Sequence, residues 1–307
     1  IKMRGHNIFW GEPYIPSWQH SMSANQLRSE ITDHIHGMTS HFKGKFKHWD
    51  VNNENLHLHY YEDKLNDEYI TFYMFRETHK SDPSSKNFLN EYNVVADGKS
   101  TLALVDQAYW FHAAGVPLHG LGVQSHFSAY VDVSIVKRRL DEVAAAGLDI
   151  WVTELDISEP DEHKKAKKYE DLMRLFFSHP AVKGVLFWGF WDGRHWRPQA
   201  ALANGNNVTP NAAGRKVREL LKHTWRTNET HNIKHGQNVQ IRGFKGYYKL
   251  LVHHNGKVIH TQNFYLGASS QNLKINLSGS GKKTESKMLL FHYALVLYCP
   301  YRRNVHL

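Results

Sequence analysis

Two glutamates stand at the ends of short apolar segments, where their carboxyl groups could carry out acid–base chemistry. Glu54 follows the segment HWDVNN, and Glu154 lies within WVTELD. Breaking a glycosidic bond requires an acid that protonates the leaving oxygen and a carboxylate that supports the oxocarbenium-like carbon. A buried strand has little other use for a carboxylate, because an unpaired buried charge is costly. The pair is therefore a candidate for glycosidic bond cleavage.

A histidine is expected to lie beside the second glutamate. Residues i and i+2 of a strand face the same side, so Glu154 and Asp156 point together, as do Gln124 and His126 one strand earlier. His126 can then donate to Glu154 while Asp156 fixes its tautomer. Such an arrangement would keep Glu154 ionised and oriented, as a nucleophile requires. The alternative is a core histidine whose ring nitrogens are satisfied by the backbone.

The elements that must position these residues recur along the chain. Short apolar segments alternate with longer stretches of helical periodicity, at a spacing on the order of 30 to 45 residues, the length of a strand-plus-helix unit. This alternation predicts a parallel sheet. The segments are MRGHNIFW (3–10), FKHWDVNN (46–53), NFLNEYN (87–93), HGLGVQSHF (119–127), DIWVTELD (149–156) and KGVLFWGFWD (183–192).

Two of the intervening stretches show where helices should run and stop. Residues 134–147 place their apolar side chains on one stripe, and Gly147 stands where a helix would end. Residues 167–180 repeat the pattern, with Pro180 beyond the helix end.

Two parallel architectures fit this alternation. A doubly wound nucleotide-binding fold should carry a glycine-rich turn after its first strand, and the sequence has none. A (β/α)₈ barrel needs no such turn and places its chemistry at the strand C-termini, where polar and aromatic residues gather here. We therefore predict an α/β fold of the (β/α)₈ type. The chain holds six such units, so two more, roughly 70 to 90 residues, are expected upstream.

The pattern changes after Thr227, and this predicts a second domain. Residues 228–278 alternate as strands do, and Asn255-Gly256 between two such runs is a strong hairpin signal. We expect the barrel at 1–227, a small β-sandwich-like module at 228–278 that is separable from catalysis, and a tail at 279–307 whose structure the sequence does not predict. The first part of that tail, 279–287, has the composition of a linker.

Charge and composition exclude several other classes of protein. The net charge is +9, but the lysines and arginines are scattered and form no nucleic-acid-binding signature. The apolar C-terminal stretch 288–307 is too short to span a bilayer comfortably. Neither a nucleic acid nor a membrane is therefore expected as a partner, and the sequence does not predict an oligomeric state.

Metal catalysis is not expected either. The only cysteine, Cys299, excludes a Cys-based metal site. The histidine pairs His34/His36 and His57/His59 lack surrounding Asp, Glu or Cys residues at zinc-site spacing. We expect no cofactor.

Six motifs in this order resemble family 10 glycoside hydrolases, the xylanase family. They are RGHNIFW, WDVNNEN, LNEYN, GVQSHF, WVTELD and SHPAVKGVLFWGFWD, and they cover about residues 1–226. The segments FWGEPYIPSW, WDVNNENLH and IRGFKGYYKLLV are similar to the plant and animal branch of that family. The family's Glu-Asn-Lys cluster has no counterpart in this chain, and Gly11 stands where many bacterial members carry a histidine.

The resemblance implies a secreted, retaining, endo-acting enzyme whose partner is the polysaccharide β-1,4-xylan. Glu54 would be the acid/base and Glu154 the nucleophile, with His126 and Asp156 orienting the nucleophile. Asn53 would hold the 2-hydroxyl of the sugar being cleaved, a contact that strengthens in the transition state. The remaining substrate-binding positions implied by the motifs are His6, Trp10, Tyr92, Gln124, Trp188 and Trp196.

Two alternatives stay open at this point. A β-1,4-glucanase or a dual-specificity enzyme would use the same two carboxylates, because xylose differs from glucose in lacking the C6 hydroxymethyl group. A non-catalytic carbohydrate-binding barrel would be a different class of protein. Decay to binding alone usually removes a carboxylate, and both glutamates are present here.

Overall fold

The computed structural model describes residues 3–234, 236–275, 292–298 and 305–306, the last two ranges by their backbone alone. The chain divides into two compact units near Arg215, earlier than the boundary at 227 expected from the sequence. Helix α7 (Ala212–Glu219) runs through this division.

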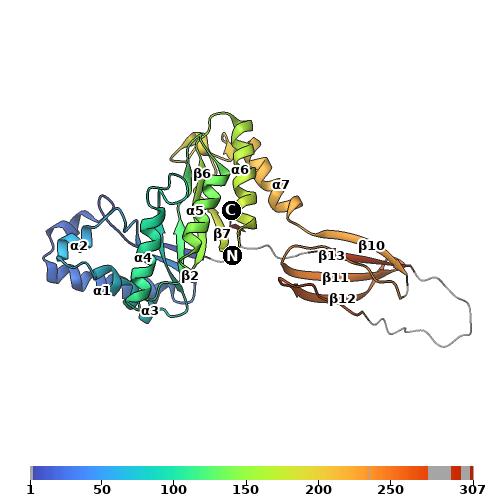
Figure 1. The fold of residues 1–307 in the computed structure, drawn as a ribbon, viewed down its shortest axis with the longest axis horizontal. Coiled ribbons are helices and arrows are strands. Elements are labelled where there is room, and N and C mark those ends of the chain that lie inside the picture. The colour runs from blue at the N-terminus through green and yellow to red at the C-terminus, as the bar shows by residue number, and fades with distance from the viewer. Residues whose placement is uncertain (1–2, 235, 276–291, 299–304, 307) are drawn as a thin grey trace, which may run out of the picture. The chain divides into compact units, whose positions relative to one another are not determined.

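The first unit is built on a curled sheet of six parallel strands, which matches a partial (β/α)₈ barrel (Figure 1). In sheet order these strands are β1 (Met3–Trp10), β2 (Phe46–Asn53), β3 (Lys86–Glu91), β4 (Gly120–Val123), β6 (Asp149–Ile157) and β7 (Val182–Phe187). The two-residue strand β5 (His126–Phe127) pairs with β6, and β14 (Val305–His306) pairs with β7. The alternation of strand and helix read from the sequence is thus confirmed.

Helices follow the strands in chain order and cover the outer face of the sheet (Figure 1). They are α1 (Ala24–Phe42), α2 (Tyr60–Leu65), α3 (Ile70–Ser81), α4 (Thr101–Ala113), α5 (Val133–Ala144) and α6 (Glu162–Ser178). Short elements complete the unit: the 3₁₀ turns η1 (Ser17–Ser21) and η2 (Pro198–Ala200), and the strands β8 (Ala203–Asn204) and β9 (Thr209–Pro210). The π-helical turn η3 (Leu220–Thr224) follows α7 and belongs to the second unit.

The helix boundaries follow the signals in the sequence. Helix α5 buries Val136, Leu140 and Val143 on one face, and Gly147 beyond its end has a φ of +71°, which glycine adopts without steric cost. Helix α6 ends at Ser178, before Pro180, as predicted. These apolar stripes attach the helices to the sheet and so hold the strand ends in place.

Close packing within the sheet depends on two glycines. A Cβ on Gly5 of β1 would lie 2.1 Å from the ring of Trp49, and a Cβ on Gly184 of β7 would lie 2.3 Å from the ring of Trp151. Trp49 and Trp151 are both buried, on β2 and β6 respectively. Large indole rings thus pack directly over the backbone of neighbouring strands, which fixes the strands that carry the two glutamates.

The second unit is one antiparallel sheet whose strand order is β10-β13-β11-β12 (Figure 1). Its strands are β10 (Asn228–Lys234), β11 (Gly246–His254), β12 (Lys257–Leu266) and β13 (His292–Tyr298). The predicted hairpin is confirmed: Asn255 and Gly256 join β11 to β12 with φ of +46° and +74°, the signs that a type I′ turn requires. Tyr248, Leu250 and Val252 form its buried core.

Two expectations for the C-terminal region are corrected. Among the described residues the module is a single four-stranded sheet rather than a sandwich of two sheets. Residues 292–298, expected in the tail, form β13 between β10 and β11, because β10 and β11 each present a free edge that this strand pairs with. The stretch 279–287 expected to be a linker lies outside the described residues.

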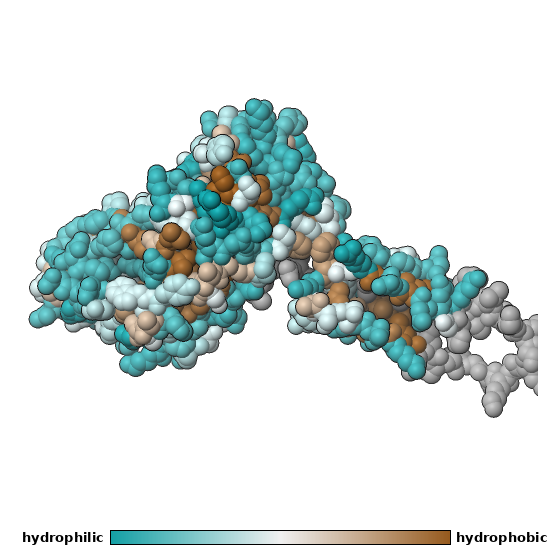
Figure 2. Space-filling model, viewed as in Figure 1, coloured by the Kyte–Doolittle hydropathy of each residue, from teal (hydrophilic) through white to brown (hydrophobic). Residues whose placement is uncertain are grey.

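The visible surface of the first unit is mostly hydrophilic. In Figure 2, hydrophilic side chains cover the helices of the first unit, and apolar residues are confined to small patches. Within the part of the chain that the structure describes, no helix has the length and apolar character to cross a membrane.

Candidate active site

Glu54 lies immediately beyond the end of β2 and carries the first of the two carboxyl groups. Its φ of +58° turns the chain sharply, and its N–H donates to the carbonyl oxygen of Asn90 at 3.0 Å. Two neutral groups donate to its carboxyl oxygens. The indole Nε1 of Trp10 is 2.9 Å from Oε2, and the amide Nε2 of Gln124 is 2.9 Å from Oε1. Glu54 is therefore held in place without a positive charge in direct contact.

Glu154 lies within β6 and is only 5% exposed. The amide Nδ2 of Asn90 donates to its Oε1 at 2.9 Å, and Nε2 of His126 is 3.0 Å from its Oε2. A buried carboxylate needs hydrogen bonds or a cation to remain ionised, and Glu154 has both within contact distance.

His126 lies between two carboxylates, as strand alternation predicts. Its second ring nitrogen, Nδ1, is 3.0 Å from Oδ1 of Asp156. Burial alone would lower the pKa of His126, but the carboxylates of Asp156 and Glu154 outweigh it and raise the pKa to about 9. His126 is therefore an imidazolium at neutral pH, and its charge faces the carboxylate of Glu154.

Asn90 links the two glutamates, and the reasoning from sequence missed it. Its side-chain amide donates to both Glu154 Oε1 and Asn53 Oδ1 at 2.9 Å, and its Oδ1 accepts from the hydroxyl of Thr153 at 2.6 Å. Its backbone carbonyl accepts from the N–H of Glu54. Strand alternation could have predicted this position, because Asn90 lies two residues before Tyr92 and so faces the same side of the strand end.

His6 has a partner set that the sequence did not reveal. Its Nδ1 is 3.0 Å from Oδ2 of Asp50, which also pairs with the guanidinium of Arg4. Burial would raise the pKa of Asp50, but Arg4 and His6 hold it below its usual value. The pKa of His6 is in turn raised, because its contacts with Asp50 and its proximity to Glu154 outweigh its burial. The parallel register places His6 directly opposite Asp50.

Two tryptophans after β7 close one side of the site. Trp188 packs edge-on against the rings of His6 and His126, with ring centroids 5.7 and 6.2 Å away. Trp196 donates from Nε1 to Oδ2 of Asp156 at 2.7 Å, and its ring is 5.0 Å from that of His126. Trp188 is 36% and Trp196 57% exposed, so both keep ring surface open to solvent.

The other predicted site residues are at the same strand ends. Tyr92 follows β3, and its ring stacks on that of His57, with the two ring centroids 3.8 Å apart. Trp10 itself stacks on Tyr14 at 3.6 Å. Gln124, which was expected to contact substrate, is buried, and its side-chain amide donates a hydrogen bond to Glu54. Every residue predicted from the motifs thus lies in or directly beside this cluster.

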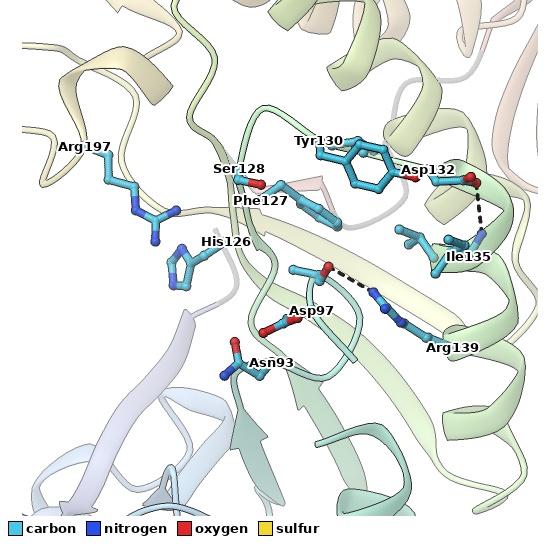
Figure 3. Close-up of a pocket in the computed structure, with 13 residues that line it drawn as sticks. Asn93, Asp97, His126, Phe127, Ser128, Tyr130, Asp132, Ile135, Arg139 and Arg197 are labelled. Carbon is cyan, nitrogen blue, oxygen red and sulfur yellow. Dashed lines mark hydrogen bonds between the residues drawn. The ribbon is translucent and has the colours of Figure 1, made fainter. Parts of the chain in front are cut away.

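A cavity of about 510 Å³ adjoins the cluster. Figure 3 shows His126 and Arg197 on one side of it, and on the other Asp132, which caps α5, with Ile135 and Arg139 of that helix. Its volume lies within the range of small-molecule binding sites. His126 lines the cavity, whereas Glu54 and Glu154 are not among its lining residues.

His34 and His36, one of the two histidine pairs, contact other parts of the protein. His34 Nε2 is 3.0 Å from the carbonyl oxygen of Ile8, and His36 pairs with Glu77. Across the described ranges, no group of three or more His, Cys, Asp or Glu side chains is placed to hold a metal ion.

A family model agrees with this geometry. The description "Glycosyl hydrolase family 10" matches residues 1–220, more than half of the chain. The chain belongs to glycosyl hydrolase family 10. The match spans the whole cluster from His6 to Trp196.

Several other proteins and solved structures are similar to the chain. An anti-sigma-I factor, RsgI6, of Acetivibrio thermocellus is 39% identical over 84% of this chain and 33% of its own length. Endo-1,4-beta-xylanase 1 of Arabidopsis thaliana is 34% identical over 91% of this chain and 30% of its own length. The chain therefore spans about a third of the length of these relatives.

The chain also resembles a solved xylanase. The crystal structure of xylanase 10B from Thermotoga petrophila in complex with xylobiose superposes with a TM-score of 0.64 at 27% sequence identity. The superposition covers 72% of this chain and 73% of that chain. This supports the assignment of the six parallel strands to a (β/α)₈ barrel.

Proposed function

We propose that this protein hydrolyses internal β-1,4-xylosidic linkages of xylan with retention of anomeric configuration. The observation that carries the proposal is that Glu54 and Glu154, which both hydrogen-bond to Asn90, have different kinds of donor at their carboxyl groups. Glu154 faces an imidazolium, whereas Glu54 receives only neutral donors. A retaining mechanism requires this division, because one carboxyl group must be ionised from the start and the other must deliver a proton.

The first step forms a covalent intermediate. An oxygen of Glu154 attacks the anomeric carbon, the bond from that carbon to the leaving oxygen breaks, and Glu54 transfers its proton to that oxygen. In the second step Glu54, now a carboxylate, removes a proton from water. The resulting hydroxide equivalent attacks the same carbon and displaces Glu154. His126 keeps its charge through both steps and stabilises Glu154 whenever it is a free carboxylate.

Residues around the pair are proposed to bind the sugar. Asn53 would contact the 2-hydroxyl group, since its amide lies beside the Asn90 amide that touches Glu154. The exposed rings of Trp188 and Trp196 suit the apolar C–H face of a pyranose. The remaining proposed contacts come from His6, Trp10, Tyr92 and Gln124.

Xylan is favoured over other β-1,4-glycans by two of the similar proteins. One is named an endo-1,4-beta-xylanase, and the other was solved with xylobiose bound. A β-1,4-glucan remains the nearest competitor for the same cleft. Polymeric xylan is too large to enter cells, so we further propose that the protein acts as a secreted enzyme.

The test is hydrolysis of soluble xylan and of carboxymethylcellulose, with the product anomer followed by ¹H NMR. We expect xylan to be cut internally and the β-anomer to appear before mutarotation. Faster cleavage of carboxymethylcellulose would make the enzyme a glucanase. Binding of xylan without cleavage would indicate a non-catalytic barrel, and initial α-anomer would contradict retention.

A further inference from the structure

Glu91 is a fully buried carboxyl group that the two catalytic steps do not use. It is 0% exposed and lies at the end of β3, between Asn90 and Tyr92. Its Oε1 accepts from the backbone N–H of Leu56 at 2.6 Å, and its Oε2 is 2.9 Å from Nδ1 of His57. A buried carboxyl group is costly to retain without a purpose, and both of its contacts go to one short turn.

His57 is fixed on three sides. Glu91 holds Nδ1, the hydroxyl oxygen of Ser100 is 3.2 Å from Nε2, and the ring of Tyr92 stacks on the imidazole with an interplanar angle of 17°. Rotation of the imidazole would break at least two of these contacts. The Tyr92 ring is thereby fixed as well, because its stacking partner cannot move.

The turn that Glu91 holds is the turn that carries Glu54. The carbonyl oxygen of Glu54 accepts from the N–H groups of both His57 and Leu58, at 2.9 and 3.0 Å. Glu54 itself has a φ of +58°, in the left-handed region that a side chain with a Cβ rarely adopts. A non-glycine residue persists there only where the surrounding structure over-determines it. The contacts of Glu91 with Leu56 and His57 supply part of that constraint.

We propose that Glu91 and His57 are positioning residues for the acid/base Glu54, and that they also fix the ring of Tyr92, which stacks on His57. The proposal rests on the retaining mechanism proposed above. Glu91 touches no reacting atom in this account. It acts by holding residues 54–58 so that the Glu54 carboxyl group lies at the leaving oxygen.

This role makes a prediction that simple stabilisation does not. Proton delivery matters in proportion to the basicity of the leaving group, so misplacing Glu54 should slow xylan and alkyl xylobiosides. A 2,4-dinitrophenyl xylobioside needs no proton and should be spared. The kinetic constant to compare is kcat/KM, because it reports the first bond cleavage and is independent of the later deglycosylation.

The variant is Glu91→Gln, which keeps the shape and an acceptor for Leu56 but removes the carboxylate from His57. We expect kcat/KM for xylan to fall about 10- to 100-fold, the range that small misplacement of a catalytic group costs. For the dinitrophenyl substrate we expect less than a twofold change. His57→Phe keeps a ring on Tyr92 but loses the Glu91 contact, and should give the same pattern if Glu91→Gln does not fold.

Glu77→Gln is the matched control. Glu77 on α3 pairs with His36 on α1 at 2.7 Å, a glutamate–histidine contact on the helical layer away from the cluster. It should leave both substrates unchanged. Equal loss on both substrates in Glu91→Gln, or no loss on either, would overturn the positioning role.

A measurement without turnover separates this inference from the proposed function. Amide hydrogen exchange at residues 54–58 should be at least severalfold faster in Glu91→Gln than in the parent, and unchanged in Glu77→Gln. If the parent protein cleaves no xylobioside at all, the proposed function fails. If exchange at 54–58 is unchanged in Glu91→Gln, the inference fails whether or not the parent is active.

Discussion

The surroundings of Glu54 and Glu154 differ in the kind of donor that reaches each carboxyl group. Glu54 lies in a turn beyond the end of β2 and receives hydrogen bonds from an indole and an amide. Glu154 lies inside β6 and faces His126, which is itself paired with Asp156. Two identical side chains can take opposite roles when one contacts a cation and the other only neutral donors.

The difference arises from the strands that each region uses. The Glu154 region draws on β3, β5 and β6, whose alternation places a second carboxylate behind the histidine. That second carboxylate, Asp156, raises the pKa of His126 and so keeps a cation next to Glu154. The Glu54 region has no equivalent charge in direct contact with its carboxyl group among the described residues.

Removing Glu154 should have the largest effect. Glu154→Ala should lower kcat on every substrate by at least about 10⁴-fold, as expected for loss of a covalent nucleophile. Azide should restore turnover of an activated xylobioside and give a product of inverted configuration, since the anion attacks from the side that Glu154 occupied. A variant that retains substantial activity would remove Glu154 from the mechanism.

Removing Glu54 should give a smaller loss that depends on the leaving group. Glu54→Ala should slow xylan cleavage about 10²- to 10⁴-fold, the usual contribution of general acid catalysis. The first step on a dinitrophenyl xylobioside should be nearly unchanged, and a burst of dinitrophenolate should precede slow deglycosylation. If Glu54→Ala and Glu154→Ala respond identically to leaving group and azide, the division of roles is wrong.

Replacing His126 should remove a pH-dependent stabilisation. The pKa of His126 is about 9 in the folded protein against an ordinary value of 6.5. Its contribution to stability is therefore complete below about pH 6.5 and lost as the pH rises through about 9. We expect His126→Gln to lower the free energy of unfolding by about 2–3 kcal/mol at pH 6 and by much less at pH 10. Urea unfolding at both pH values measures this, and a pH-independent difference would contradict the charge assigned to His126.

A change in the second unit should have the smallest effect on catalysis. Leu250→Ala removes a side chain from the buried core of the antiparallel sheet and should destabilise that unit by about 2–5 kcal/mol. Because both carboxyl groups lie in the first unit, kcat/KM and its pH profile should stay within twofold of the parent. A shifted pH profile would mean that the second unit reaches the active site.

Much of this arrangement could be predicted from the sequence, because it rests on local rules. The bounds of β1 and β2 were predicted to the residue, and the alternation in β6 was enough to place His126 between Glu154 and Asp156. The hairpin at Asn255-Gly256 was predicted from the requirement for positive φ. Each of these signals lies within a few residues of the feature it predicts.

What was missed depends on contacts between distant segments. Asn90 touches Glu54, Asn53 and Glu154 only because β3 lies between β2 and the strands that follow it in the sheet. The pairing of Asp50 with Arg4 and His6 depends on the register of two strands more than 40 residues apart. Strand β13 was missed because periodicity cannot show that a segment will enter the middle of a sheet formed by strands earlier in the chain.

Trapping the covalent intermediate would show directly which of the two glutamates is the nucleophile. A 2-deoxy-2-fluoro-β-xylobioside with a dinitrophenolate leaving group should inactivate the protein with stoichiometric release of the phenol, because the fluorine slows deglycosylation more than the activated first step. Peptide mapping by mass spectrometry should then find the added fluoroxylobiosyl mass on Glu154. A label on Glu54, or turnover without any labelled residue and with inverted product, would contradict the roles assigned to the two glutamates.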